Sequence, residues 1–85
     1  MPVRELTFSR EALKSLRRMP ENVASTIRSK LVQYTRDPSA LGNNVKALKG
    51  QVRLLRLRVG DWRVVFTDDG RVVAVSRIAP RGKRL

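Results

Sequence analysis

The stretch that decides the fold runs over residues 53–66 and reads RLLRLRVGDWRVVF. Leucines, valines and aromatics alternate with arginines on both sides of Gly60-Asp61, a pair typical of a two-residue type II′ hairpin turn with glycine first. A turn of this length fixes the pairing of the two flanking strands, so that Arg58 lies opposite Arg63. The sequence therefore predicts an antiparallel hairpin with one apolar face and one arginine-rich face.

Side chains alternate along a strand, so this register assigns each hairpin residue to a face. The face predicted to pack on the helices holds Leu55, Leu57, Val59, Trp62, Val64 and Phe66. The opposite face is predicted to hold Leu54, Arg56, Arg58, Arg63 and Val65. Like charges directly opposite each other destabilise a sheet by about 0.2–1 kcal/mol per pair, and a bound anion would relieve that repulsion. The pattern favours a phosphate-binding surface over a merely solvated sheet face.

The next turn and strand extend this sheet. Asp68-Asp69-Gly70 indicates a three-residue loop with Gly70 in the left-handed conformation. If Thr67 pairs with Arg71, the strand over residues 71–78 sends Val73, Val75 and Arg77 to the arginine-rich face. The same register sends Val72, Ala74, Ser76 and Ile78 to the core.

The N-terminal half predicts one strand and two helices. Residues 3–8 alternate as a short strand, with Leu6 and Phe8 on one side. Ser9 suits the cap of a helix that ends at Met19-Pro20. The apolar positions of this helix are Ala12, Leu13 and Leu16. A second helix over residues 20–36 carries the stripe Val23, Ile27, Leu31 and Tyr34.

A polar loop over residues 38–44 leads into a strand predicted over 45–48 that runs on into 53–59. Together these elements predict an α+β fold in which a helical hairpin packs on a small antiparallel sheet, in the order β-α-α-β-β-β. With 85 residues, the chain is expected to form a single domain over 1–85.

The composition excludes several kinds of site. The chain has neither cysteine nor histidine, which excludes a disulfide framework, a thiolate metal site and an imidazole base. We therefore expect no metal and no cofactor. No apolar run approaches the roughly 18 residues of a membrane span, and the N-terminus lacks the apolar core of a signal peptide. We expect a cytoplasmic protein without a membrane partner.

Charge is the strongest global signal. Nineteen Lys and Arg against seven Asp and Glu give a formal net charge of +12, with most of the excess after residue 45. The planar guanidinium of arginine suits bidentate contacts to phosphate. This balance favours a polyanionic partner, either nucleic acid or an acidic protein.

Cleavage of RNA by its own 2′-hydroxyl needs a proton acceptor, a proton donor and cations that stabilise the charged transition state. Arginines supply the cations but do not give up their protons. Candidates for proton transfer are Lys46 and Lys49 and, less strongly, Asp61, Tyr34 and Lys83. Trp62 and Phe66 are interpreted as core residues, which leaves few aromatic side chains for base stacking.

Three segments carry a family resemblance: LKG at 48–50, RLRVGDWRVVF at 56–66 and VSRIAPRGK at 75–83. With the order of elements, they resemble the RelE/ParE superfamily of bacterial type II toxins over nearly the whole chain. The resemblance implies a compact α+β fold and an antitoxin that wraps and neutralises the toxin. RelE-like members cut messenger RNA in the ribosomal A site with a basic concave sheet, whereas ParE-like members poison DNA gyrase.

Carried over residue by residue, the resemblance implies catalytic roles for Arg56, Arg63 and Arg81, with Lys49 as a nearby basic position. Together with the charge pattern, it predicts RNA or phosphate binding by Lys46, Arg53, Arg58, Arg77 and Lys83. The sequence departs from the RelE-like pattern in two places. Leu85 stands where many of these nucleases have a tyrosine, and Leu54 stands where the family pattern has another lysine.

These observations leave three functions open. The favoured one is a toxin that acts as a ribosome-dependent mRNA endoribonuclease, an mRNA interferase that inhibits translation and arrests growth. A gyrase inhibitor without nuclease activity is the alternative that the missing tail tyrosine favours. The third is a decayed toxin that only binds its antitoxin or RNA. The expected partners are a cognate acidic antitoxin and either the ribosome with its mRNA or DNA gyrase.

Overall fold

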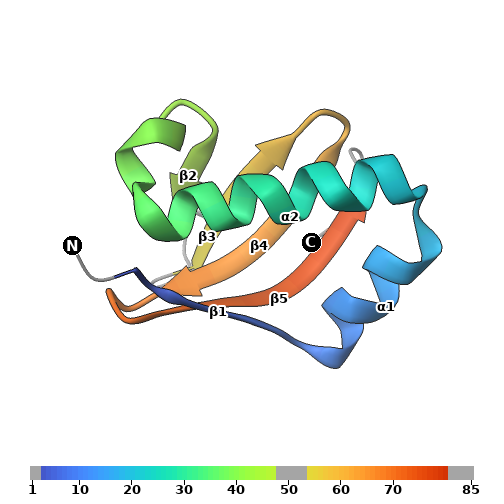
Figure 1. Ribbon diagram of the computed structural model, residues 1–85, viewed down its shortest axis with the longest axis horizontal. Coiled ribbons are helices and arrows are strands. Elements are labelled where there is room, and N and C mark those ends of the chain that lie inside the picture. Colours follow the sequence, from blue (N-terminus) through green and yellow to red (C-terminus); the bar gives the residue numbers. More distant parts are fainter. Residues whose placement is uncertain (1–2, 48–53, 81–85) are drawn as a thin grey trace.

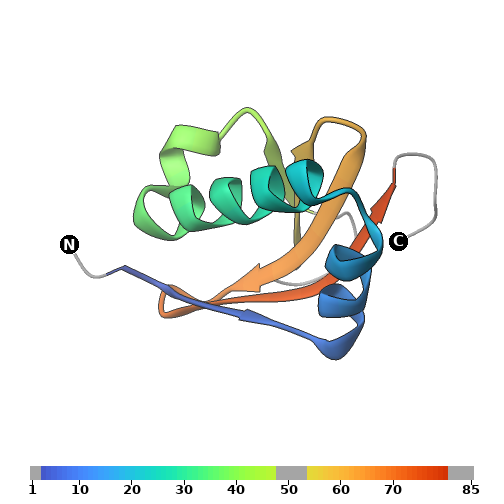
Figure 2. The same ribbon diagram turned by 45° about the vertical axis from the view of Figure 1, so that its right-hand side comes forward.

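The computed structural model describes residues 3–47 and 54–80 of the chain. Within these ranges the elements are β1 (Glu5–Phe8), α1 (Arg10–Arg18), α2 (Glu21–Arg36), the 3-10 helix η1 (Pro38–Leu41), β2 (Val45–Ala47), β3 (Leu54–Val59), β4 (Trp62–Asp68) and β5 (Val72–Pro80). The strands form a five-stranded sheet in the order β1-β5-β4-β3-β2. Helix α2 crosses one face of this sheet, and α1 lies beside β5 (Figures 1 and 2).

The helices begin and end where the sequence predicts. The Ser9 hydroxyl caps α1 by accepting a hydrogen bond from the backbone N–H of Ala12 at 3.0 Å. Ala12 and Leu16 are buried, but the predicted core position of Leu13 is wrong because its side chain is 40% exposed. Adjacent helical residues differ by roughly 100° around the axis, so Leu13 points away from the line that joins Ala12 and Leu16.

The apolar stripe of α2 packs as predicted. Ile27, Leu31 and Tyr34 are buried, and Val23 is partly buried against the same core. Strands β3, β4 and β5 supply the other side of this core, including Leu57, Val64, Phe66 and Val75. One apolar stripe on the helix and one apolar face on the sheet therefore account for most of the buried interior.

The α+β fold class is confirmed, with two helices packed on one sheet. The sheet is mixed, because β1 pairs with β5 in parallel while the other strands pair antiparallel. The prediction that one strand continues from residues 45–48 into 53–59 is wrong. β2 and β3 are separate strands that pair antiparallel with each other, with Lys46 opposite Arg56.

The β3–β4 register is confirmed, since Val59 pairs with Trp62 and Arg58 with Arg63. Gly60 has φ of +56°, which explains why the turn requires glycine there. The predicted pairing of Thr67 with Arg71 is wrong, because Thr67 pairs with Ala74.

The corrected register changes the face of the first half of β5. Val73 and Val75 are buried in the core rather than exposed among the arginines. Val72 and Ala74 are only partly buried and Ser76 is exposed, against the prediction that they belong to the core. A bulge opposite Val65 and Phe66 leaves Ser76 outside the β4–β5 register, although its hydroxyl still donates to the Val65 carbonyl oxygen at 3.2 Å. The extra residue restores the predicted faces of Arg77 and Ile78.

One polar network joins the N-terminal strand to the rest of the fold. The carboxylate of Asp68 accepts hydrogen bonds from Arg4 Nε at 2.8 Å, from the Tyr34 hydroxyl at 2.8 Å and from the Gly70 backbone N–H at 2.9 Å. Arg4 precedes β1, Tyr34 lies on α2 and Gly70 lies in the β4–β5 turn. Burial tends to raise the pKa of Asp68, but these three hydrogen bonds together lower it.

Candidate nucleic-acid interface

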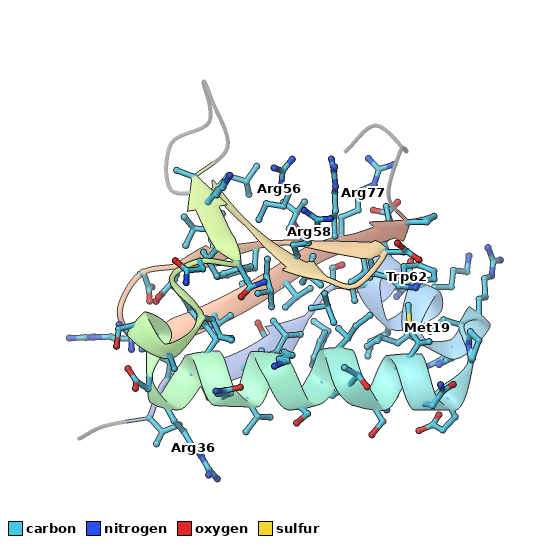
Figure 3. All side chains as sticks on the ribbon, turned by 90° about the horizontal axis from the view of Figure 1, so that it is seen from above. Met19, Arg36, Arg56, Arg58, Trp62 and Arg77 are labelled. Atoms are coloured by element: carbon cyan, nitrogen blue, oxygen red, sulfur yellow. The ribbon has the colours of Figure 1, made fainter. Side chains whose placement is uncertain are left out.

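Strand pairing gathers cations on the sheet face that the helices leave open. Lys46 on β2 pairs with Arg56 on β3. Val65 on β4 lies between Arg56 and Arg77 of β5. One row of residues across four strands thus carries three cations. Figure 3 shows Arg56, Arg58 and Arg77 projecting on the side of the sheet opposite α2.

A second row lies next to the first. Arg58 pairs directly with Arg63, which in turn pairs with Ala79 on β5. The sequence prediction that two arginines face each other across the hairpin is therefore confirmed. We call the following five residues the basic face: Lys46, Arg56, Arg58, Arg63 and Arg77.

A hollow of about 100 Å³ opens on the basic face beside β2. It is lined by Asn43, Asn44, Lys46, Arg56, Arg58 and Arg63. The backbone N–H of Arg58 donates to the carbonyl oxygen of Asn44 at 2.9 Å, which holds the loop before β2 against β3. Four of the six lining residues are cationic and none is acidic, so the hollow suits an anion with several acceptor oxygens, such as a phosphate.

The cations of the basic face have no acidic partners among the described residues. Within residues 3–47 and 54–80, ion pairs shorter than 4 Å join Arg4 to Asp68 and Arg28 to Glu21, and neither involves the basic face. The same ranges contain no group of three or more acidic side chains that could hold a metal ion. An external anion is therefore the natural counter-charge for this surface.

The predicted site residues fall into two groups. Lys46, Arg56, Arg58, Arg63 and Arg77 come together on the basic face. The hairpin register predicts this for Arg56, Arg58 and Arg63, whereas Arg77 reaches the face through the bulge in β5. The remaining predicted residues lie outside the residues that the structure describes: Lys49, Arg53, Arg81 and Lys83.

Tyr34, one of the weaker candidates for proton transfer, lies on the wrong side of the sheet. It is 5% exposed, and its ring meets Phe66 edge-on with centroids 5.0 Å apart. Burial, followed by the hydrogen bond to the Asp68 carboxylate, raises the pKa of Tyr34 to about 12. A hydroxyl buried in the core on the helix side of the sheet does not reach RNA on the basic face, so this prediction is wrong.

The other two described candidates for proton transfer, Lys46 and Asp61, lie at different places in the fold. Lys46 lines the hollow among the arginines. Asp61 is exposed in the β3–β4 turn and lines a different cavity, beside α2. Of the described groups proposed for proton transfer, Lys46 is therefore the one that the fold places with the arginines.

Sequence reasoning missed Asn43 and Asn44, which it assigned to a polar loop. Their contribution depends on the pairing of β2 with β3, because that pairing carries the loop to the edge of the basic face. The sequence offers one signal, the position of Asn44 two residues before Lys46 in the short segment that leads into β2.

Comparison with known proteins identifies the family. Residues 6–85 match the family described as the ParE toxin of the type II toxin-antitoxin system parDE. The chain belongs to this toxin family. Among curated protein sequences, none matches the chain. Within the described residues of this ParE-family toxin, no helix combines the length and apolar character needed to cross a membrane.

Solved structures of RelE-type toxins share the fold of this ParE-family toxin. The archaeal RelE–RelB complex of Pyrococcus horikoshii OT3 matches with a TM-score of 0.78 and 20% identity, over 98% of this chain and 100% of that one. The intact RelBE complex of E. coli matches with a TM-score of 0.74 and 25% identity, over 95% of this chain and 99% of that one. The RelBE2 complex of Mycobacterium tuberculosis matches with a TM-score of 0.78 and 20% identity, over 98% of this chain and 97% of that one. The RelE/ParE superfamily resemblance is therefore confirmed.

Proposed function

We propose that this toxin is a cytoplasmic endoribonuclease that cuts messenger RNA on the ribosome and so inhibits translation and growth. The observation that carries the proposal is the basic face, where five cations from four strands share one side of the sheet and four of them line a hollow without an acidic residue. A gyrase inhibitor that binds protein has no evident need for such a concentration of phosphate-binding groups. The overlap with RelE-type folds supports the same choice.

The role proposed for the basic face is to stabilise the negative charge that develops during RNA cleavage. Attack of a ribose 2′-oxygen on the adjacent phosphorus creates a pentacoordinate phosphorane with extra negative charge, and the bond to the 5′-oxygen then breaks. Arg56 and Arg63 are proposed to hold that charge, together with Arg81 in the tail. Lys46 or Lys49 is proposed to transfer a proton at the attacking or leaving oxygen. Arg58 and Arg77, with Arg53 and Lys83, are assigned to the flanking phosphates.

An antitoxin is the proposed partner, because the RelE-type relatives were solved in complex with RelB antitoxins. A net charge of +12 favours an acidic, amphipathic segment that lies across the basic face or along the helices. Exposed ion pairs contribute only about 0–1 kcal/mol each, so tight neutralisation also needs apolar anchors.

Inhibition of DNA gyrase is the second candidate, and two observations favour it. The matching family is described by its ParE toxin. In addition, RNA cleavage needs both a proton acceptor and a proton donor. Among the described residues, Lys46 is the single candidate for proton transfer that lies on the basic face. Supercoiling by purified gyrase, measured with and without the toxin, separates this function from RNA cleavage.

Primer extension on translated mRNA after induction of the toxin tests the nuclease. We expect discrete cuts at fixed codon positions, and intact transcripts would refute the proposal. Arg63→Ala should reduce the cleavage rate by about 10²–10³-fold, the loss typical of removing one group that stabilises an anionic transition state. Arg81→Ala should abolish cutting in the same assay.

Arg36→Ala is the matched control for the arginine variants. Arg36 is exposed in the last turn of α2 and points away from the sheet, on the side opposite Arg56 and Arg77 (Figure 3). This variant removes the same charge but should cut RNA at the wild-type rate. Equal losses in Arg36→Ala and Arg63→Ala would show that net charge matters and that the basic face has no special role.

A further inference from the structure

We infer that a second cavity, between α1 and the end of β5, holds one unpaired base of the RNA strand whose phosphates lie on the basic face. The inference rests on the proposed function and adds a base-binding site to it. This cavity has a volume of about 400 Å³, which lies within the range of small-molecule sites. We call it the α1–β5 cavity. Its lining includes Glu11, Arg18, Trp62, Arg77, Ile78 and Ala79.

The cavity exists because β5 extends beyond its neighbour. The parallel pairing of β1 with β5 ends where Phe8 meets Val75. From there the chain turns through Ser9 into α1, so α1 rather than a strand flanks the last residues of β5. A helix cannot fill the edge of a sheet as closely as another strand does, and the space left between them opens beside Arg77 and Ala79.

Arg77 connects this cavity with the basic face. Its position in the row of Arg56 and Val65 makes it part of the phosphate-binding surface, and it also lines the α1–β5 cavity. Arg18 supplies a second cation from α1 on the opposite wall. A strand that crosses the basic face thus reaches a cavity whose lining has one cation from β5 and one from α1.

The interior suits the flat apolar surface of a base. Trp62 packs against the core but is only partly buried, and it lines the cavity. Its interpretation as a pure core residue is therefore incomplete. Ile78 and Ala79, from opposite faces of β5, add apolar groups to the lining and are 3% and 6% exposed. Indole rings stack on bases of any sequence, because every base has a π face.

Glu11 distinguishes a base from a simple anion. A carboxylate in the lining repels a bare phosphate or an acidic side chain, but it accepts hydrogen bonds from the N–H groups of a base. A lining that combines aromatic, apolar and carboxylate groups with two arginines matches a nucleotide in single-stranded RNA. It matches an acidic peptide poorly.

Trp62 is the single tryptophan of the chain and lines both this cavity and the one beside α2, so its fluorescence reports base stacking at this end of the sheet and the Arg18 variant assigns the signal to the α1–β5 cavity. We would titrate the full-length toxin at low salt with a short single-stranded RNA carrying an end label. A second titration would use an abasic ribose-phosphate strand of the same length. Label anisotropy reports binding of either strand, and Trp62 emission reports base stacking. We expect both strands to bind but only the base-bearing RNA to quench Trp62.

Two neighbouring arginines of α1 provide a matched pair of variants. Arg18→Ala removes a lining residue, whereas Arg17→Ala removes the same charge from an exposed position outside the lining. The Kd for quenching should rise about tenfold in Arg18→Ala, as expected for one charge-assisted contact. Arg17→Ala should change it far less.

Several results would overturn the inference. They are binding of RNA without quenching, equal quenching by the abasic strand, equal effects of the two arginine variants, or equal quenching by an acidic peptide. Absence of binding by either strand would also overturn it. None of these results decides the proposed function, because cleavage of translated mRNA is measured separately and depends on the basic face.

Discussion

Asp68→Ala should destabilise the fold more than any other removal of a single carboxylate, because three hydrogen bonds converge on this group. Its donors come from three separate segments: Arg4 before β1, Tyr34 on α2 and Gly70 in the β4–β5 turn. The substitution therefore loosens the attachment of β1 and leaves the buried hydroxyl of Tyr34 without its acceptor.

The magnitude follows from the exposure of the donors. Removing the partner of a buried hydroxyl costs about 1–3 kcal/mol, and Tyr34 is 5% exposed. The side chain of Arg4 is 25% exposed, so its ion pair contributes less than about 1 kcal/mol. The hydrogen bond from the Gly70 backbone adds about 1 kcal/mol. We expect a total loss of about 3 kcal/mol, which lowers Tm by roughly 12–24 °C in a domain of this size.

Urea unfolding followed by circular dichroism measures the loss. Asp61→Ala is the matched control, since it removes an exposed carboxylate from the β3–β4 turn and should change the free energy of unfolding by at most about 0.5 kcal/mol. Tyr34→Phe removes only the hydroxyl and should cost about 1 kcal/mol. A loss below about 1 kcal/mol in Asp68→Ala would refute the idea that this network holds β1 to the fold.

Three further outcomes are expected. Tyr34 is the single tyrosine, and absorbance at 295 nm should show its ionisation near pH 12 rather than 10. The contribution of Tyr34 to stability should be complete below pH 10 and lost as pH rises through 12. The lowered pKa of Asp68 means that its contribution is present above pH 3.8 and lost as pH falls below that value, so the urea midpoint should drop in acid, and less so in Asp68→Asn. Arg58→Gln should raise the free energy of unfolding by about 0.2–1 kcal/mol, because it relieves the repulsion with Arg63, and it should weaken RNA binding. Lys30→Gln on α2 is the control for net charge. A lower stability of Arg58→Gln would contradict the reasoning.

Local rules predicted the central hairpin and the helices correctly. A two-residue turn determines the pairing of its own strands, so Arg58 opposite Arg63 follows from Gly60-Asp61 alone. The same holds for the cap at Ser9, which depends on a hydrogen bond to a residue three positions away. Predictions failed where a longer turn left the register open, as for Thr67, whose partner is Ala74 instead of Arg71.

The sequence by itself determined that arginines gather on one face of a hairpin, because alternation along a strand and a tight turn are properties of neighbouring residues. Tertiary structure alone decided how far that face extends. Pairing with β2 brought Lys46 and Asn44 to its edge, and the bulge at Ser76 returned Arg77 to it. The packing of α1 beside the last residues of β5 also depended on tertiary structure, and it opened the α1–β5 cavity beside Trp62. Such features depend on contacts between segments far apart in the chain, and no local pattern encodes them because their energies arise only when the whole sheet is assembled.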